Sequence, residues 1–277
     1  MQNMLQIEYP SEPWTWRPRK LSRSQIEAIA WSVRQQLGYA GSRRLQLPFD
    51  SIRRIATLKV NGIKFSLEWS VEHAISNEEG QPVLGLCEYD HEGLPDAVLI
   101  HVNPQIVNGR QELLLSTAAH ELGHAIFDAS SWIAIAHAPV LRGLVEELPR
   151  RVQRLTSPDA SHLEPGGGSG IVTDWREWRA NEFMGSMLVP RALLMPLFLA
   201  LARLLKMPVH AERAQTSWLD EEYWVDRLIR VDSSPAQAPK LSLLIRMLAL
   251  RFGVTSRFME VRLKRYGFLD QSYGRAA

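Results

Sequence analysis

Alternating apolar and polar positions predict a β-strand over residues 63–69, and residues 83–89 and 97–102 are also strand-like. Turn-forming residues at 77–82 and 91–96 separate these three segments. Because strands joined by short turns usually pair in opposite directions, we expect a small antiparallel sheet. Helical patterns lie before and after these strands in the sequence, which makes the predicted fold class α+β.

Helical periodicity dominates the rest of the chain. Before Pro190 it predicts helices over residues 24–37, 48–56, 110–129, 141–155 and 174–188. After Pro190 it predicts helices over residues 191–206, 219–231, 240–252 and 255–266. Two segments have the composition of loops, namely the proline-containing residues 1–22 and the residues 156–170, which are rich in glycine, serine and proline.

The order of these elements predicts two domains. The first, residues 1–207, holds the sheet and the helices around it, with residues 130–172 as an insertion or loop region. The second, residues 208–277, is helical and contains a helix-turn-helix-like segment at 240–269, with Gly253 at the turn. Basic residues outnumber acidic ones from residue 240 onward, which fits a nucleic acid, an acidic protein surface or a solvated helical face.

The composition limits the cellular compartments in which the protein is expected. The 277 residues contain a single cysteine, Cys87, so no disulfide forms within one chain and a reducing compartment is expected. The N-terminal residues lack the apolar core of a signal peptide, and the most apolar stretch, residues 192–202, is too short to span a bilayer. The formal net charge of +2 selects no class of partner. We therefore expect a cytoplasmic protein without a membrane segment.

Residues 120–124, His-Glu-Leu-Gly-His, are the clearest sign of chemistry in the chain. On a helix, residues four apart lie one above the other, so His120 and His124 can share one metal ion. Glu121 is rotated by about 100° from His120 around the helix, which lets it act as a general base without being a ligand. This five-residue pattern arises by chance in about one chain of this size in a hundred, so its context matters.

The surrounding apolar positions favour a metal site over two surface histidines. One apolar stripe runs along the predicted helix 110–129 at helical spacing: Leu115, Ala118, Ala119, Leu122, Ala125 and Ile126. His120 and His124 fall nearly opposite this stripe, so the stripe can pack on the core while the histidines face a cleft. Asp128, one turn after His124, either orients that histidine or faces solvent.

A catalytic zinc ion usually has three protein ligands, so a third is expected elsewhere in the chain. The helix predicted to begin at Asp174 offers two carboxylates, Glu177 and Glu182, which lie about 140° apart around its axis. Glu177 lies at the edge of the inward side together with Asn181, whereas Glu182 is expected to point away. Glu177 is therefore the expected ligand, the alternative being an ordinary acidic residue at a helix N-terminus. Asn181 is expected to hydrogen-bond a ligand histidine.

Two segments together resemble the metal-site helices of a known family. Residues 116–127 (STAAHELGHAIF) and 177–190 (EWRANEFMGSMLVP) are similar to the paired motifs of the ImmA/IrrE family of bacterial and phage metallopeptidases. Looser similarity extends to residues 48–69 and 98–104, which look like the family's N-terminal helix and strands. Residues 248–269 are similar to its helix-turn-helix-like C-terminal segment.

The resemblance implies a zincin-like metallopeptidase domain in which the sheet packs on the active-site helices. It implies one zinc ion held by His120, His124 and Glu177, with Glu121 as the catalytic base, although a His-His-Glu site also accepts manganese or iron. The implied partner is a protein substrate, namely a helix-turn-helix repressor whose cleavage derepresses stress-response or mobile-element genes. The chain departs from the family pattern at Arg179, where an acidic residue is common, and in the length of the 130–172 insertion.

Two other functions stay open at this point. In the first, the protein is not an enzyme: its zinc ion is structural, and the basic C-terminal region binds a repressor or DNA, in the latter case with an affinity that falls steeply with salt. In the second, the chain is a zinc hydrolase that acts on small amides. The joint occurrence of two metal-site motifs favours the peptidase over both.

Overall fold

The computed structural model describes residues 3–41, 43–77, 79–138, 151–155, 174–212 and 228–270. The chain forms two compact units. The first unit contains Met1–Gly38 and Pro48–Met187, and the second contains Tyr39–Leu47 and Leu188–Ala277. The domain boundary predicted at residue 207 thus lies inside the second unit.

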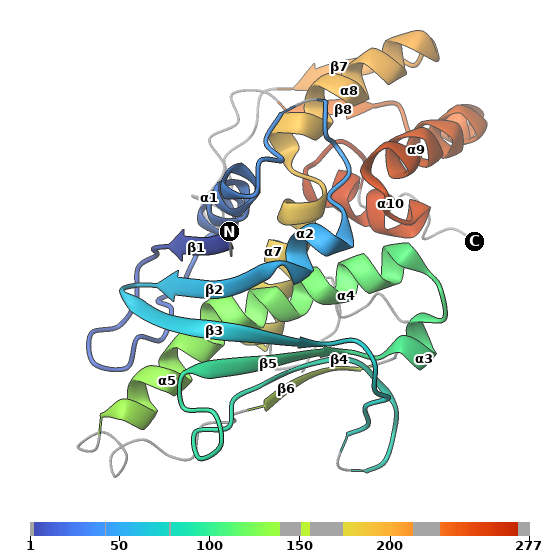
Figure 1. Ribbon diagram of the computed structural model, residues 1–277. Helices are drawn as coiled ribbons and strands as arrows, with labels where there is room; N and C mark the ends of the chain where they lie inside the picture. The colour runs from blue at the N-terminus through green and yellow to red at the C-terminus, as the bar shows by residue number, and fades with distance from the viewer. Residues whose placement is uncertain are drawn as a thin grey trace. The chain divides into compact units, whose positions relative to one another are not determined.

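The first unit is built on a six-stranded sheet with the strand order β1-β2-β3-β5-β4-β6 (Figure 1). Its strands are β1 (Asn3–Ile7), β2 (Ile55–Val60), β3 (Ile63–Ser70), β4 (Val83–Glu88), β5 (Ala97–Val102) and β6 (Arg151–Leu155). The three strands predicted over residues 63–69, 83–89 and 97–102 are confirmed as β3, β4 and β5. Together with the helices, this sheet confirms a mixed α and β fold.

The sheet is mixed, so the prediction of a purely antiparallel sheet is wrong. β3 pairs with β5 in parallel and β1 pairs with β2 in parallel, whereas the β2–β3, β4–β5 and β4–β6 pairs are antiparallel. The segment 71–82 carries the chain away from β3, so that β4 does not pair with it. β5 then returns through the turn at 91–96 and fills the place between β3 and β4. Turn-forming residues show where a connection between strands lies, but they do not show which strand becomes the neighbour of β3 in the sheet.

The sequence patterns do not predict three of the strands, β1, β2 and β6. β1 lies in the segment predicted to be irregular, and β2 begins at Ile55 because helix α2 covers only Phe49–Arg53 of the predicted helix 48–56. β6 occupies the end of the predicted helix 141–155. The start of that helix and the predicted loop 156–170 lie outside the described residues. β1 and β6 have 5 residues each, too few for a clear period of two, and they form through pairing with strands distant in sequence.

Helix α1 (Arg23–Gln36) begins with a capping box at Ser22, two residues before the start of the predicted helix 24–37. The Ser22 hydroxyl accepts from the Gln25 N–H, and the Gln25 side chain accepts from the Ser22 N–H. Near its other end, the buried Arg34 donates from Nη1 to the Met187 carbonyl at 2.8 Å. This bond ties α1 to the end of helix α7 (Trp175–Leu188).

Helix α4 (Gln111–His124) follows the short helix α3 (Pro104–Val107) and packs on strands β4 and β5, along one face of the sheet (Figure 1). The predicted end at residue 129 is wrong. A π-helical turn, η1 (Ala125–Ala129), links α4 to α5 (Ser130–His137), so the helical segment continues by two further turns. Every residue from Leu115 to His124 is buried, including the face opposite the predicted apolar stripe. The histidines therefore lie inside the unit.

The second unit is mainly helical. It contains α8 (Arg191–Leu204), the antiparallel pair β7 (Val209–Glu212) and β8 (Leu228–Val231), the 3₁₀ turn η3 (Pro235–Gln237), α9 (Ala238–Phe252) and α10 (Ser256–Arg265). The helix predicted over 219–231 is wrong for residues 228–231, which form β8, and residues 219–227 lie outside the described part of the chain.

Helices α9 and α10 confirm the two consecutive helices predicted within residues 240–269. At the turn between them, Gly253 has a φ of +67°. A Cβ atom at this position would meet the side chain of Gln46. The positive φ therefore favours glycine, and a larger residue would also displace the exposed Gln46 side chain.

Within the described ranges, no single helix has the length and apolar character needed to cross a membrane. The bent pair α7 and α8 reaches that length and composition only when its two helices are taken together.

Candidate metal centre

His120 and His124 lie one turn apart near the end of α4, and their side chains converge. The two Nε2 atoms are 3.1 Å apart, and the rings meet edge to face with centroids at 4.8 Å. Both side chains are buried, with exposed fractions of 1% and 0%. The four-residue spacing thus has the effect predicted from helical geometry, since both imidazoles present the same nitrogen to one point.

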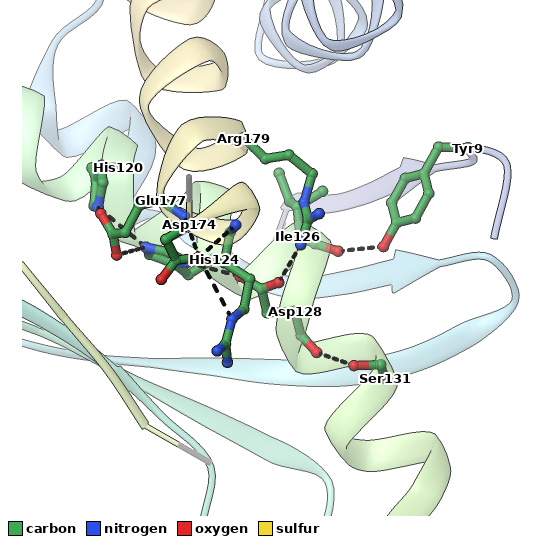
Figure 2. Close-up of polar contacts among 10 residues, drawn as sticks. Tyr9, His120, His124, Ile126, Asp128, Ser131, Asp174, Glu177 and Arg179 are labelled. Atoms are coloured by element: carbon green, nitrogen blue, oxygen red, sulfur yellow. Dashed lines mark hydrogen bonds and ion pairs between the residues drawn. The ribbon is translucent and has the colours of Figure 1, made fainter. Parts of the chain in front are cut away.

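Glu177, from the first turn of α7, supplies a carboxylate to this point (Figure 2). Its Oε2 atom lies 3.3 Å from Nε2 of His120, and its Oε1 atom lies 3.1 Å from Nε2 of His124. Among the residues that the structure describes, these three form the group of side chains that could hold a metal ion, with ligand atoms all within 4.8 Å of one another. The Glu177 side chain is 34% exposed, whereas both histidines are buried.

Two local features bring α7 to the histidines. Asp174 caps the helix: its Oδ1 accepts from the backbone N–H of Arg176 at 2.9 Å and of Glu177 at 3.5 Å, as predicted. Gly123, between the histidines, allows a close approach of the two helices. A Cβ atom on Gly123 would lie 3.0 Å from Cα of Ala180, one turn after Glu177. The backbone of α7 therefore passes as near to α4 as a glycine permits.

The electrostatics of the group suit a cation. Burial by itself would raise the pKa of Glu177, but hydrogen bonds and charge from His120 and His124 hold it well below its usual range. Burial would lower the pKa of His124, yet hydrogen bonds and the negative charges of Asp128 and Glu177 raise it to about 10. The carboxylates that favour a proton on this imidazole equally favour a metal cation beside it.

Asp128 faces His124 and not the solvent, which decides between the two roles considered for it. Its Oδ2 atom lies 2.8 Å from Nδ1 of His124, on the opposite side of the ring from Glu177. Its Oδ1 atom accepts from Nη2 of Arg179 at 2.9 Å. Asp128 is only 4% exposed. The partner Arg179 was not foreseen, because the two residues are far apart in the chain and no periodic pattern links them.

The π-helical turn η1 that carries Asp128 is itself held by side chains. The Tyr9 hydroxyl donates to the Ile126 carbonyl at 2.8 Å (Figure 2). It also lies 3.2 Å from the Ser130 hydroxyl. The Ser131 hydroxyl donates to the Asp128 carbonyl at 2.7 Å. Burial raises the pKa of Tyr9 above its usual value, which keeps the hydroxyl a donor. Such turns often occur at functional sites, and here the turn contributes the residue next to His124.

Glu121 is fully buried and lies against strand β4. A Cβ atom on Gly85 of β4 would collide with the Glu121 carboxylate and would lie 2.6 Å from Cγ2 of Thr117. Gly85 thus leaves the space that the Glu121 side chain occupies. The sequence held a signal for this, since an isolated glycine within a strand often marks a close approach.

The other predicted residues of α7 lie as follows. Asn181 is buried, with 8% exposed, and its hydrogen bond to a ligand histidine stays a prediction. Glu182 is only 1% exposed, so the expectation that it points away from the protein is wrong. The reason is that every residue of α7 from Ala180 to Leu188 is buried, so this part of the helix has no face exposed to solvent. Cys87 is buried in β4, as expected of a small core residue.

Comparison of the chain with protein-family models, with curated proteins and with solved structures gives no match. The resemblance to the ImmA/IrrE family therefore depends on the motif residues themselves.

Removal of the Glu177 carboxylate should abolish tight metal binding. We expect about one zinc ion per chain in the wild type and less than about a tenth of that in Glu177→Ala, because two imidazoles alone leave the ligand set incomplete. Elemental analysis of both proteins, purified side by side after addition of zinc, measures this. The matched control is Glu112→Ala, which removes an exposed carboxylate from the first turn of α4. Equal zinc contents in Glu177→Ala and the control would exclude Glu177 as a ligand.

Proposed function

We propose that this chain is a cytoplasmic zinc-dependent endopeptidase. Its substrate is a protein, namely a helix-turn-helix repressor, and cleavage of that repressor derepresses stress-response or mobile-element genes. One observation carries the enzymatic part of the proposal: the donor atoms of His120, His124 and Glu177 converge within 4.8 Å of one another. Glu121, which follows His120 in the sequence, is fully buried. The substrate class follows from the resemblance of the motifs to the ImmA/IrrE family.

The ligand set suits this chemistry. Two imidazoles and one carboxylate form a recurrent ligand set of hydrolytic zinc sites, with one position left for the reaction. When bound, a zinc ion supplies Lewis acidity, which polarises a carbonyl group and lowers the pKa of water to roughly 7. The partial exposure of Glu177 supports access of a peptide to the site.

The chain's own residues then carry the proton transfers. Glu121 follows the first histidine and is rotated away from the ligand positions, so its carboxylate can accept a proton from the attacking water. It then passes this proton to the leaving amine when the peptide bond breaks. Gly85 and Thr117 border the Glu121 carboxylate and restrict where it can lie. A general base accelerates the reaction only when it lies within hydrogen-bond distance of the proton it accepts, so a restricted position of the carboxylate favours catalysis.

The rival function, DNA binding through α9 and α10, loses support at α10. Arg262 is buried, and its guanidinium lies 4.3 Å from the centre of the Tyr266 ring. Lys264 is also buried and pairs with Glu260 at 3.0 Å. A helix that binds DNA presents its cations to phosphates and base edges. Arg262 and Lys264 are therefore not available for that role, whereas Arg246 and Arg251 of α9 and Arg257 of α10 are exposed.

The substitution Glu121→Gln tests the role of the base. We expect it to keep the zinc content of the wild type and to slow peptide cleavage by about 10²–10⁴-fold, since an amide cannot accept the proton. The probe is a mixture of purified helix-turn-helix repressors together with proteins of equal size that have no such fold. New chain termini are counted by mass spectrometry after incubation with each zinc-loaded protein.

Three results would contradict parts of this proposal. Cleavage by Glu121→Gln at the wild-type rate would exclude Glu121 as the base. Cleavage of the control proteins as fast as the repressors would exclude the substrate class. Absence of new termini with the zinc-loaded wild type would exclude the peptidase and favour the binding function.

Gly85→Ala tests the placement of Glu121 without changing any reacting group. The added methyl group has to displace the Glu121 carboxylate, because Thr117 is β-branched and buried and moves less readily. We expect normal zinc content with cleavage reduced by about tenfold to a hundredfold, as for a misplaced catalytic group. Gly41→Ala is the control, since a Cβ atom there meets nothing within 4 Å. Equal rates for the two variants would show that Gly85 does not restrain the base.

A further inference from the structure

Helix α7 reaches the His124 ring by two routes that end on different nitrogen atoms. Glu177 contacts Nε2 directly, at 3.1 Å. Arg179 acts on the other nitrogen through Asp128: its Nη2 donates to Asp128 Oδ1 at 2.9 Å, and Asp128 Oδ2 lies 2.8 Å from Nδ1 of His124 (Figure 2). Glu177 and Arg179 are two residues apart, about 200° around the helix, so one helical turn extends to both ends of the ring.

The Arg179–Asp128 ion pair is not explained by stability alone. The two side chains are 12% and 4% exposed. Desolvation of two charges offsets most of their attraction, so a buried pair of this kind is a weak source of net stability. Its geometry is specific, however, because each oxygen of Asp128 has its own partner. The guanidinium occupies one oxygen and leaves the other directed at the imidazole.

The contact with Asp128 also suits the tautomer of His124 that a metal ligand needs. With a metal ion on Nε2 in place of a proton, the ring hydrogen would be on Nδ1, and the Asp128 carboxylate would accept it. A histidine ligand held in this way has both its ring orientation and its donor atom fixed. An unrestrained Asp128 would be able to turn towards another partner and release the ring.

We propose that Arg179 is a positioning residue of the metal centre. It holds the Asp128 carboxylate on Nδ1 of His124, and it thereby couples the placement of α7, which carries Glu177, to the orientation of the histidine ligand on α4. This inference rests on the proposed metal site but not on peptidase activity. The sequence presents Arg179 only as a departure from the family pattern, and its function becomes visible through its contact with Asp128.

Cobalt(II) is the probe for this inference, because its affinity and its visible absorption band both report on the ligands. The affinity for Co²⁺ is measured by titration against a chelator for the wild type, Arg179→Gln, Asp128→Asn and the double variant. We expect Arg179→Gln to bind about 10–100-fold more weakly and to show a shifted absorption band. The matched control is Arg176→Gln, which removes a partly exposed arginine from the same turn of α7.

The double variant separates positioning from a general effect on the fold. If Arg179 acts through Asp128, its substitution has no further effect once Asp128→Asn is present, so the two losses do not add. Additive losses would overturn the inference, and so would wild-type affinity and absorption in Arg179→Gln. Thermal unfolding without added metal identifies a variant that fails to fold. In that case Arg179→Lys takes its place, with an intermediate loss expected because an ammonium group lacks the planar fork of arginine.

Different results would refute the metal centre and the positioning role of Arg179. Wild-type protein that binds no cobalt would refute the metal centre, and with it the role of Arg179. Wild-type protein that binds cobalt while Arg179→Gln binds equally well would refute the positioning role alone. Loss of affinity in Arg179→Gln that disappears in the Asp128→Asn background supports the inference, whether or not a peptide substrate is cleaved.

Discussion

The contact between one carboxylate and two imidazoles is the interaction on which the rest of the site depends. Glu177 lies 3.1–3.3 Å from the Nε2 atoms of His120 and His124, and these residues come from helices separated by more than fifty positions in sequence. The contact requires α7 to begin at the right place, which the Asp174 cap ensures. It also requires α7 to pass close to α4. Most other features of the first unit can be understood as conditions for this single contact.

Burial of the two histidines and Glu121 in α4 costs desolvation free energy. α4 is buried from Leu115 to His124, so His120, Glu121 and His124 give up their contacts with water. Such groups are tolerated when they are paired, and the partners of the two histidines come from outside α4. Glu177 serves the two Nε2 atoms, and Asp128 serves the second nitrogen of His124. Buried polar groups with several fixed partners contribute less to stability than apolar side chains would. Their fixed positions, however, suit a group that could hold a cation.

Sequence patterns predicted those features that depend on neighbours within one turn or one strand. The period of two located β3, and the four-residue spacing predicted the convergence of His120 and His124. The choice of Glu177 over Glu182 also followed from angles around one helix, although the burial of Glu182 did not. Features formed between distant segments were missed, including the parallel pairings of the sheet and the edge strand β6. The Arg179–Asp128 pair and the π-helical turn belong to the same class, because neither leaves a periodic trace in the sequence.

The two middle residues of the His-Glu-Leu-Gly-His pattern show why its context matters more than its length. Leu122 is fully buried and belongs to the apolar stripe of α4. Gly123 faces α7, where any side chain would press on the backbone at Ala180, within 3.0 Å of its Cβ position. A larger residue at position 123 would move Glu177 away from the imidazoles without changing any ligand. The pattern itself leaves these two positions open. Here a core residue followed by a glycine meets the packing that brings Glu177 to the imidazoles, so both residues contribute to a group that could hold a metal ion.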